Sequence, residues 1–288
     1  MGTVIDRAAV VHGGWRHRHS ALQLAVEAGR DCLAAADQRT DDVSLLINAG
    51  IYRDRNLGEP ALAALIQDEL GVHPEDPHPR DHGAFSFDVA NGTCGVLTAL
   101  QIADAWLRSG SITESLIVAS DADPGRGRSR AFPYAPVGGA LLCRWSAMDP
   151  GLRQPQWVTV ADTADIVHSE VGFTGMRNVL RFGQARDVDD TFADAAAQAV
   201  RKCLAVADVA LEDVGWLIAA PARPGFRAAL ADRLGIDAQR IRTAPDDHTH
   251  TAALIAAYRN ADTRFEPARP MLLVAAGAGV TAGAALYG

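Results

Sequence analysis

Cys94, His248 and His250 are the side chains of this 288-residue chain whose types and positions best suit nucleophilic chemistry. Cys94 stands at the start of a predicted helix, where free backbone N–H groups and the helix dipole favour a thiolate. The two histidines stand at the start of another predicted helix, and either one could act as a base for the thiol proton. Alternatively, Cys94 is a small core residue, as free cysteines often are. The sequence leaves both interpretations open.

The two histidines lie in the segment DDHTHT, directly after Asp246 and Asp247. An acidic neighbour can raise the pKa of a histidine or fix its tautomer. Alternatively, Asp247 or the intervening threonine caps the helix and the histidines face solvent. A metal site has little support, because no cysteine or carboxylate cluster completes a tetrahedral set with these residues or with His78 and His82. We therefore expect neither a metal nor a cofactor.

The elements that must position these residues form an internal repeat. Apolar residues recur at three- and four-residue steps in the predicted helices, and the predicted strands are short continuous apolar runs, typical of strands covered on both faces. The order helix, strand, helix occurs twice, as Ser20–Asp37, Asp42–Gly50 and Leu62–Val72 and again as Phe192–Asp208, Asp213–Pro221 and Arg227–Ile236.

The two halves continue in parallel beyond these blocks. The first half adds strand Phe85–Ala90, helix Thr93–Leu107 and strands Glu114–Ser120 and Val137–Trp145, and the second adds helix Thr249–Asn260 and strands Met271–Ala276 and Val280–Tyr287. We therefore predict an α/β protein of two pseudo-twofold related halves, residues 1–149 and 150–288, that meet at the turn-forming Asp149-Pro150-Gly151. Two proline-rich loops, Val72–Gly83 and Asp121–Pro136, either border a site or are solvated connectors.

Composition excludes several classes of protein. The net charge of −8 argues against a nucleic-acid partner, which requires a basic face. No uncharged apolar stretch of about 18 residues is present, so we expect no membrane span. The segment Met1–Val11 lacks the apolar run of a secretory signal. The four cysteines form no CxxC pair, which is typical of free thiols in a cytoplasmic protein.

Two segments carry a resemblance to a known family. Phe85–Gly110 resembles the nucleophile strand–turn–helix of ketoacyl-ACP synthase III, and Ala275–Gly288 resembles its closing glycine-rich hairpin. The repeated blocks match that family in their order as well. The resemblance implies the thiolase-like fold, with five layers in the order αβαβα. It also implies an enzyme that takes an acyl group from acyl-CoA or acyl carrier protein and condenses or transfers it.

The three catalytic positions that the resemblance implies are all substituted. Matching without gaps from Phe87-Asp88 places Thr93 at the position of the family's cysteine, with Cys94 one residue later. One residue along a helix turns a side chain by about 100°, so Cys94 would point elsewhere unless the turn is rebuilt. Ala220 occupies the position of the family's histidine, and Thr249 that of its asparagine.

The resemblance also implies which residues line a substrate cavity. We expect His248 or His250 to reach the cavity, and Thr93 and the backbone of Gly277–Gly279 to shape an oxyanion pocket. The full set of expected substrate-binding residues is Asn91, Thr249, Ala220, Arg223, Gly277 and Gly279.

Two functions remain open from the sequence. The first is an acyl-thioester transferase of a specialised polyketide or fatty acid pathway. It would use Cys94 as a nucleophile, or would work without a covalent step with His250 as a general base. The second is a catalytically silent subunit that pairs with an active ketosynthase. The family joins its central sheets into dimers, so by analogy we expect a homodimer or a heterodimer with a ketosynthase.

Overall fold

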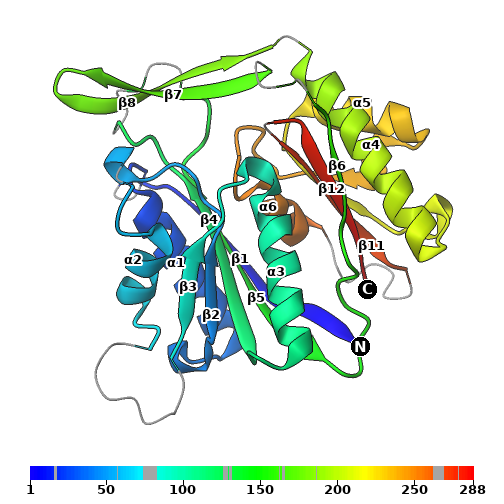
Figure 1. The fold of residues 1–288 in the computed structure, drawn as a ribbon, viewed down its shortest axis with the longest axis horizontal. Helices are drawn as coiled ribbons and strands as arrows, with labels where there is room; N and C mark the ends of the chain where they lie inside the picture. The colour runs from blue at the N-terminus through cyan, green and yellow to red at the C-terminus, as the bar shows by residue number, and fades with distance from the viewer. Residues whose placement is uncertain are drawn as a thin grey trace.

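The computed structural model describes residues 1–15, 18–56, 58–73, 83–125, 129, 132–161, 163, 166–185, 187–261, 269–277 and 279–288. Two five-stranded sheets run through the molecule, with helices on both sides of each (Figure 1). His78 and His82, which were considered for a metal, lie outside the described residues. Within the described ranges, no group of three or more His, Cys, Asp or Glu residues could hold a metal ion.

The two sheets have the same topology. In each, two antiparallel pairings are followed by two parallel ones. The first sheet has the order β1 (Gly2–His12), β5 (Val137–Ser146), β4 (Glu114–Asp121), β2 (Leu45–Asn48) and β3 (Phe85–Asp88). The second has the order β6 (Gln156–Thr159), β12 (Thr281–Tyr287), β11 (Met271–Gly277), β9 (Leu217–Ala220) and β10 (Ile241–Arg242). The predicted pseudo-twofold α/β fold is confirmed.

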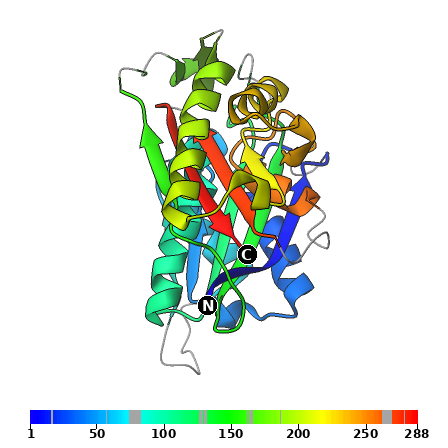
Figure 2. The same cartoon turned by 90° about the vertical axis from the view of Figure 1, so that its right-hand side faces the viewer.

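Three hydrophobic clusters hold the layers together. One joins the first sheet to the outer helices α1 (Ala21–Ala36) and α2 (Leu62–Leu70). A second joins the other sheet to α4 (Val188–Ala207) and α5 (Pro224–Leu234). The third lies between the sheets and contains α3 (Gly95–Ser109) and α6 (Ala253–Asn260). Figure 1 shows this sandwich of helix, sheet, helix, sheet and helix edge-on, and Figure 2, turned by 90°, shows α4 in front of the second sheet.

Local sequence explains the boundaries of the elements that the repeat predicted. Ser20 is extended, and its hydroxyl accepts a hydrogen bond from the Gln23 N–H, which begins α1 as expected for an N-cap. The same helix ends at Asp37 in the left-handed conformation. Strands β2 and β9 are buried along their whole length, which explains why they read as continuous apolar runs.

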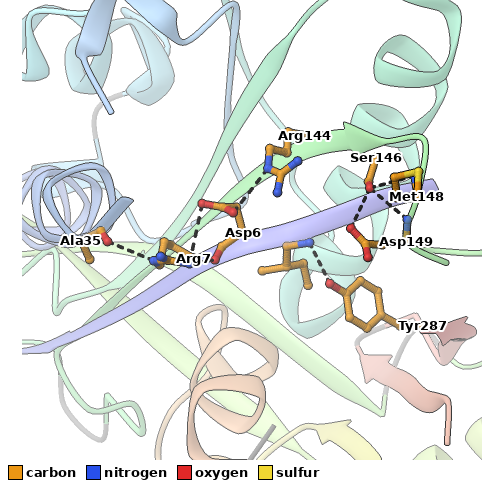
Figure 3. A network of polar contacts seen from close by, with 9 residues as sticks. Asp6, Arg7, Ala35, Arg144, Ser146, Met148, Asp149 and Tyr287 are labelled. Atoms are coloured by element: carbon orange, nitrogen blue, oxygen red, sulfur yellow. Dashed lines mark hydrogen bonds and ion pairs between the residues drawn. The ribbon is translucent and has the colours of Figure 1, made fainter. Parts of the chain in front are cut away.

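Strand β1 makes polar contacts with both halves of the chain (Figure 3). The sequence alone did not predict this strand. The Ile5 N–H donates a 2.8 Å hydrogen bond to the Tyr287 hydroxyl at the end of β12. On the other side, Asp6 pairs with Arg144 of β5 at 3.3 Å, and Arg7 donates to the Ala35 carbonyl of α1. Strand β1 therefore contacts an outer helix, its own sheet and the opposite half.

A two-stranded hairpin, β7 (Val167–Thr174) and β8 (Arg177–Gln184), was also not predicted. Its strands pair only with each other among the described strands, and most described side chains of β7 are exposed, so the apolar pattern is weak. Helix α6 begins at Ala253 and not at Thr249, because the N–H and hydroxyl of Thr251 bind the Asp121 carboxylate and hold the preceding residues in turns. No described helix is long and apolar enough to cross a membrane.

Candidate functional site

A cavity of about 390 Å³ lies where the turn before α3 meets the end of β11. We call it the Thr93 cavity. Residues from both halves line it, and they include six of those named from the sequence: Thr93, Arg223, His248, Thr249, His250 and Gly277. Asn91 instead lines a neighbouring cavity of about 500 Å³, which we call the Tyr52 cavity. Cys94, Ala220 and Gly279 line neither of the two.

Thr93 lies in the short helix η3 (Gly92–Cys94), which continues into α3. Its hydroxyl donates a short hydrogen bond to the Ala276 carbonyl oxygen on β11. This contact requires a glycine opposite, because a Cβ added at Gly277 would lie 2.7 Å from the Thr93 hydroxyl oxygen. Thr93 and Gly277 therefore form one wall of the cavity, as expected. Gly279 lies beyond it, in the turn between β11 and β12, with a φ of 70°.

Cys94 points away from the cavity and into the core. Its side chain has no exposed area and belongs to the cluster between the two sheets. The thiol donates to the Thr281 carbonyl oxygen at 3.3 Å. Burial raises the pKa of this thiol to about 12, and a protonated thiol is a poor nucleophile. The geometry thus supports the interpretation of Cys94 as a core residue and gives no support to a rebuilt nucleophile.

His250 contacts a buried carboxylate that the sequence did not indicate. Its Nδ1 lies 3.4 Å from the Asp121 Oδ1, and Asp121 is fully buried at the end of β4. Among the described contacts of Asp246, its carboxylate accepts the backbone N–H of His248 and does not reach a ring. The acidic partner therefore comes from the other half of the chain, 129 residues away, and not from the adjacent aspartates.

Aromatic side chains pack around the His250 ring. Its ring stacks on Tyr134 with centroids 4.0 Å apart and an interplanar angle of 20°. Tyr52 stacks on Tyr134 in turn, and Phe182 of β8 packs edge-on against both tyrosines. Burial raises the pKa of Tyr52 and of Tyr134, so both phenols stay neutral. The only sequence signal for this cluster was that the loop Asp121–Pro136 is proline-rich, which left open whether it borders a site or is a solvated connector.

His250, Tyr134, Phe182 and Val167 line both cavities, so the two cavities meet at the His250 ring. The other histidine is held differently: the His248 Nδ1 lies 3.0 Å from the Pro133 carbonyl oxygen. Arg223 also lines the Thr93 cavity. Its guanidinium pairs with the Asp189 carboxylate of α4 and donates to the Gln184 side chain. Its charge is therefore already matched by a protein group.

Ala220 ends β9 and is fully buried, with the neighbouring Pro221 at the cavity wall. Its methyl group offers no hydrogen bond to a ligand. Of the three positions that the resemblance assigned to catalysis, Thr93 and Thr249 are only 4% exposed and reach the Thr93 cavity, whereas Ala220 does not. A base in this site must therefore come from elsewhere, and His250 and His248 are the histidines that line the Thr93 cavity.

The shared topology of the two sheets, with a cavity between the halves, defines a thiolase-like fold. Solved structures agree: Xanthomonas campestris OleA with bound lauric acid and lauroyl-CoA superposes with a TM-score of 0.81 at 17% identity, over 100% of this chain and 99% of that one. FabH, a 3-oxoacyl-(acyl carrier protein) synthase III from Pseudomonas aeruginosa PAO1, gives 0.80 at 18% identity, over 100% and 98%.

Sequence comparison finds relatives of one kind, the ketoacyl-ACP synthases III. Residues 204–288 match the family model of the 3-oxoacyl-[acyl-carrier-protein] synthase III C-terminal part. The chain is 28% identical to β-ketoacyl-[acyl-carrier-protein] synthase III of Rhizorhabdus wittichii, over 97% of this chain and 89% of that protein. It is 27% identical to the enzyme of the same name from Novosphingobium aromaticivorans, over 99% and 92%. The chain is thus similar to ketoacyl-ACP synthase III proteins over nearly its whole length, which agrees with the resemblance.

Proposed function

We propose that this protein is an acyltransferase that binds an acyl thioester in the Thr93 cavity and transfers the acyl group without an acyl-cysteine intermediate. One observation carries the proposal: Thr93 and Thr249 line the cavity, whereas the Cys94 thiol is buried outside it. The names of the related synthases include the acyl carrier protein, and OleA was solved with bound lauroyl-CoA. Acyl-CoA or an acyl carrier protein is therefore the proposed donor, in a fatty acid or polyketide pathway.

The transfer needs a base for the acceptor, and His250 is the proposed base. An acceptor hydroxyl or amine gives its proton to the His250 imidazole as its oxygen or nitrogen attacks the thioester carbonyl carbon. The new C–O or C–N bond forms, the C–S bond breaks, and the leaving thiolate takes the proton back from the imidazolium. Backbone N–H groups at the cavity wall near Thr93 and Gly277 are the proposed donors to the negative charge that develops on the carbonyl oxygen.

Intact-protein mass and product formation together test this proposal. The purified protein is incubated with acyl-CoA and acyl-carrier-protein thioesters of graded chain length, together with hydroxyl and amine acceptors. We expect thioester consumption and acylated acceptor without any stable increase in protein mass, and the same result for Cys94→Ala. A mass increase in the wild type that Cys94→Ala abolishes would overturn the non-covalent mechanism.

A second candidate is the catalytically silent subunit of a ketosynthase. The substitutions at Thr93, Thr249 and Ala220 favour it, because none of these side chains matches the catalytic group that the resemblance assigns there. If no thioester binds or turns over, and the chain instead associates stably with a ketosynthase encoded beside it, this second function replaces the first.

A homodimer formed through β3 is proposed for either function. Strand β3 is the edge of its sheet and pairs only with β2, so its outer backbone groups are available to a second strand. Phe85 on this strand is 55% exposed and stacks on Trp106 of α3, which continues the apolar edge. We expect sedimentation to show a dimer that Phe85→Glu weakens.

The free, buried cysteines are consistent with a cytoplasmic location.

A further inference from the structure

We infer that Asp121 and His250 form a carboxylate–imidazole dyad, in which Asp121 is the positioning residue and His250 presents Nε2 as the catalytic base. The catalytic part of this inference rests on the proposed acyltransferase function. Asp121 ends β4, and His250 lies in the turn before α6. The His250 base would thus replace the histidine that the resemblance places at the end of β9, where this chain has Ala220. No motif in the sequence joins Asp121 and His250.

Thr251 and His250 hold the two oxygens of the Asp121 carboxylate. Both hydrogen bonds to its Oδ2 come from Thr251, whose N–H donates at 2.7 Å and whose hydroxyl donates at 3.0 Å. The remaining oxygen, Oδ1, faces the His250 Nδ1 at 3.4 Å. A carboxylate oxygen at this position accepts a hydrogen bond from Nδ1–H, so the lone pair of the neutral imidazole lies on Nε2.

The orientation of the His250 ring is also fixed by its contacts. Its flat stack on Tyr134 leaves the imidazole edge, and not its face, to carry the chemistry. A Cβ added at Gly92 would lie 3.9 Å from the His250 Nε2, so this nitrogen faces the turn that leads to Thr93. The His250 side chain is only 13% exposed, which limits competition from water. Nε2 is therefore close to the place where a thioester at Thr93 would react.

The other polar groups around the ring do not compete with Asp121. Tyr52 and Tyr134 are neutral because burial raises the pKa of each phenol. Arg223, which lines the Thr93 cavity, is paired with Asp189. His248 makes its own contact with the Pro133 carbonyl oxygen. Among the described contacts of the His250 ring, the one carboxylate is that of Asp121.

The tautomer of His250 tests the dyad without any knowledge of the substrate. Long-range proton–nitrogen NMR correlations of protein labelled with ¹⁵N-histidine distinguish a protonated Nδ1 from a protonated Nε2. The chain has nine histidines, and the signals lost in His250→Gln identify the relevant ring. We expect the Nδ1-protonated form for neutral His250 in the wild type. A predominantly Nε2-protonated ring would overturn the inference, and this measurement needs no variant of Asp121.

Two variants separate Asp121 from the acidic residue beside the histidines. Asp121→Asn should shift the His250 tautomer ratio, whereas Asp246→Asn should leave it unchanged, since the one described contact of the Asp246 carboxylate is with the backbone N–H of His248. If Asp121→Asn does not fold, Thr251→Val provides a milder change that removes one hydrogen bond to the same carboxylate. A tautomer ratio that follows Asp246 and not Asp121 would contradict the dyad.

Kinetics then test the catalytic role. In the acyl-transfer assay, His250→Gln should lower kcat by about 100-fold or more, the size expected for loss of a general base. Asp121→Asn should lower kcat while KM for the acyl-CoA changes little, because Asp121 lies behind the ring and not at the ligand. Equal loss in kcat and thioester affinity for Asp121→Asn would indicate a merely structural role.

These outcomes separate the inference from the proposed function. Failure of every acyl thioester to bind the wild-type protein would remove the acyltransferase while leaving the tautomer result intact. Thioester binding and turnover with an Nε2-protonated His250 would retain the acyltransferase and remove the dyad.

Discussion

The Thr93 hydroxyl donates a hydrogen bond to the Ala276 carbonyl oxygen, and this contact joins the turn before α3 to the last strand pair of the opposite half. Thr93 occupies the position that the family resemblance assigns to the nucleophile. Because its proton is committed to a backbone acceptor 183 residues away, its role in this structure is to hold the cavity wall in place.

Removal of this hydroxyl should destabilise the protein. Thr93→Val keeps the shape of the side chain but leaves the buried Ala276 carbonyl without its donor, so we expect a loss of about 1–3 kcal/mol in the free energy of unfolding. Thr93→Ser keeps the donor and should cost less. Urea unfolding of the two variants measures the difference, and equal stabilities would show that the hydrogen bond contributes nothing.

The native thiols should be unreactive. All four cysteines are buried, and burial raises the pKa of the Cys94 thiol to about 12, so it stays protonated at neutral pH. We expect no alkylation of the folded protein by iodoacetamide at pH 8, and full alkylation after denaturation. Thr93→Cys should create one reactive thiol, because the new side chain faces the cavity at a helix start. Rapid alkylation of Cys94 in the wild type would contradict this assignment.

Gly277 should tolerate no larger side chain while Thr93 is present. A Cβ there would lie 2.7 Å from the Thr93 hydroxyl oxygen, so Gly277→Ala should lower the free energy of unfolding by about 1–3 kcal/mol. Thr93→Ala removes the clashing atom, and the double variant should lose less stability than the sum of the two single ones. Additive losses in thermal or urea unfolding would indicate that the two residues do not contact.

Glu114 should weaken the fold at neutral pH. Burial raises its pKa, with Asp42 and Asp6 adding to the effect, and its Oε2 is buried without a hydrogen-bond partner in the described structure. The folded state therefore holds the proton more tightly than the unfolded state, and stability falls as the pH rises through this range. Glu114→Gln should gain up to about 1 kcal/mol at pH 7.

The gain should disappear near pH 4, where the wild-type carboxyl is protonated as well. The exposed Glu170 on β7 provides the matched control, since Glu170→Gln should leave the free energy of unfolding almost unchanged at both pH values. A Glu114→Gln gain that is independent of pH would contradict the titration of this carboxyl.

Much of the fold could be predicted from local sequence. The apolar steps in α1 and α4 and the continuous apolar runs of β2 and β9 are short-range patterns, and the repeat of their order predicts the pseudo-twofold sandwich. Strand β1 and the hairpin β7–β8 were not predicted, because β5, the partner of β1, lies far along the chain and most described side chains of β7 are exposed.

The sequence by itself determined the residue types available for chemistry and the one-residue offset between Thr93 and Cys94. Only the tertiary structure decided their roles. It placed Cys94 in the core and brought Asp121, Tyr134 and His250 together, because the end of β4, the loop after it and the turn before α6 converge between the two sheets. Contacts between residues 129 positions apart leave no periodic trace in a sequence, so the pairing of Asp121 with His250 emerges only when the two halves pack.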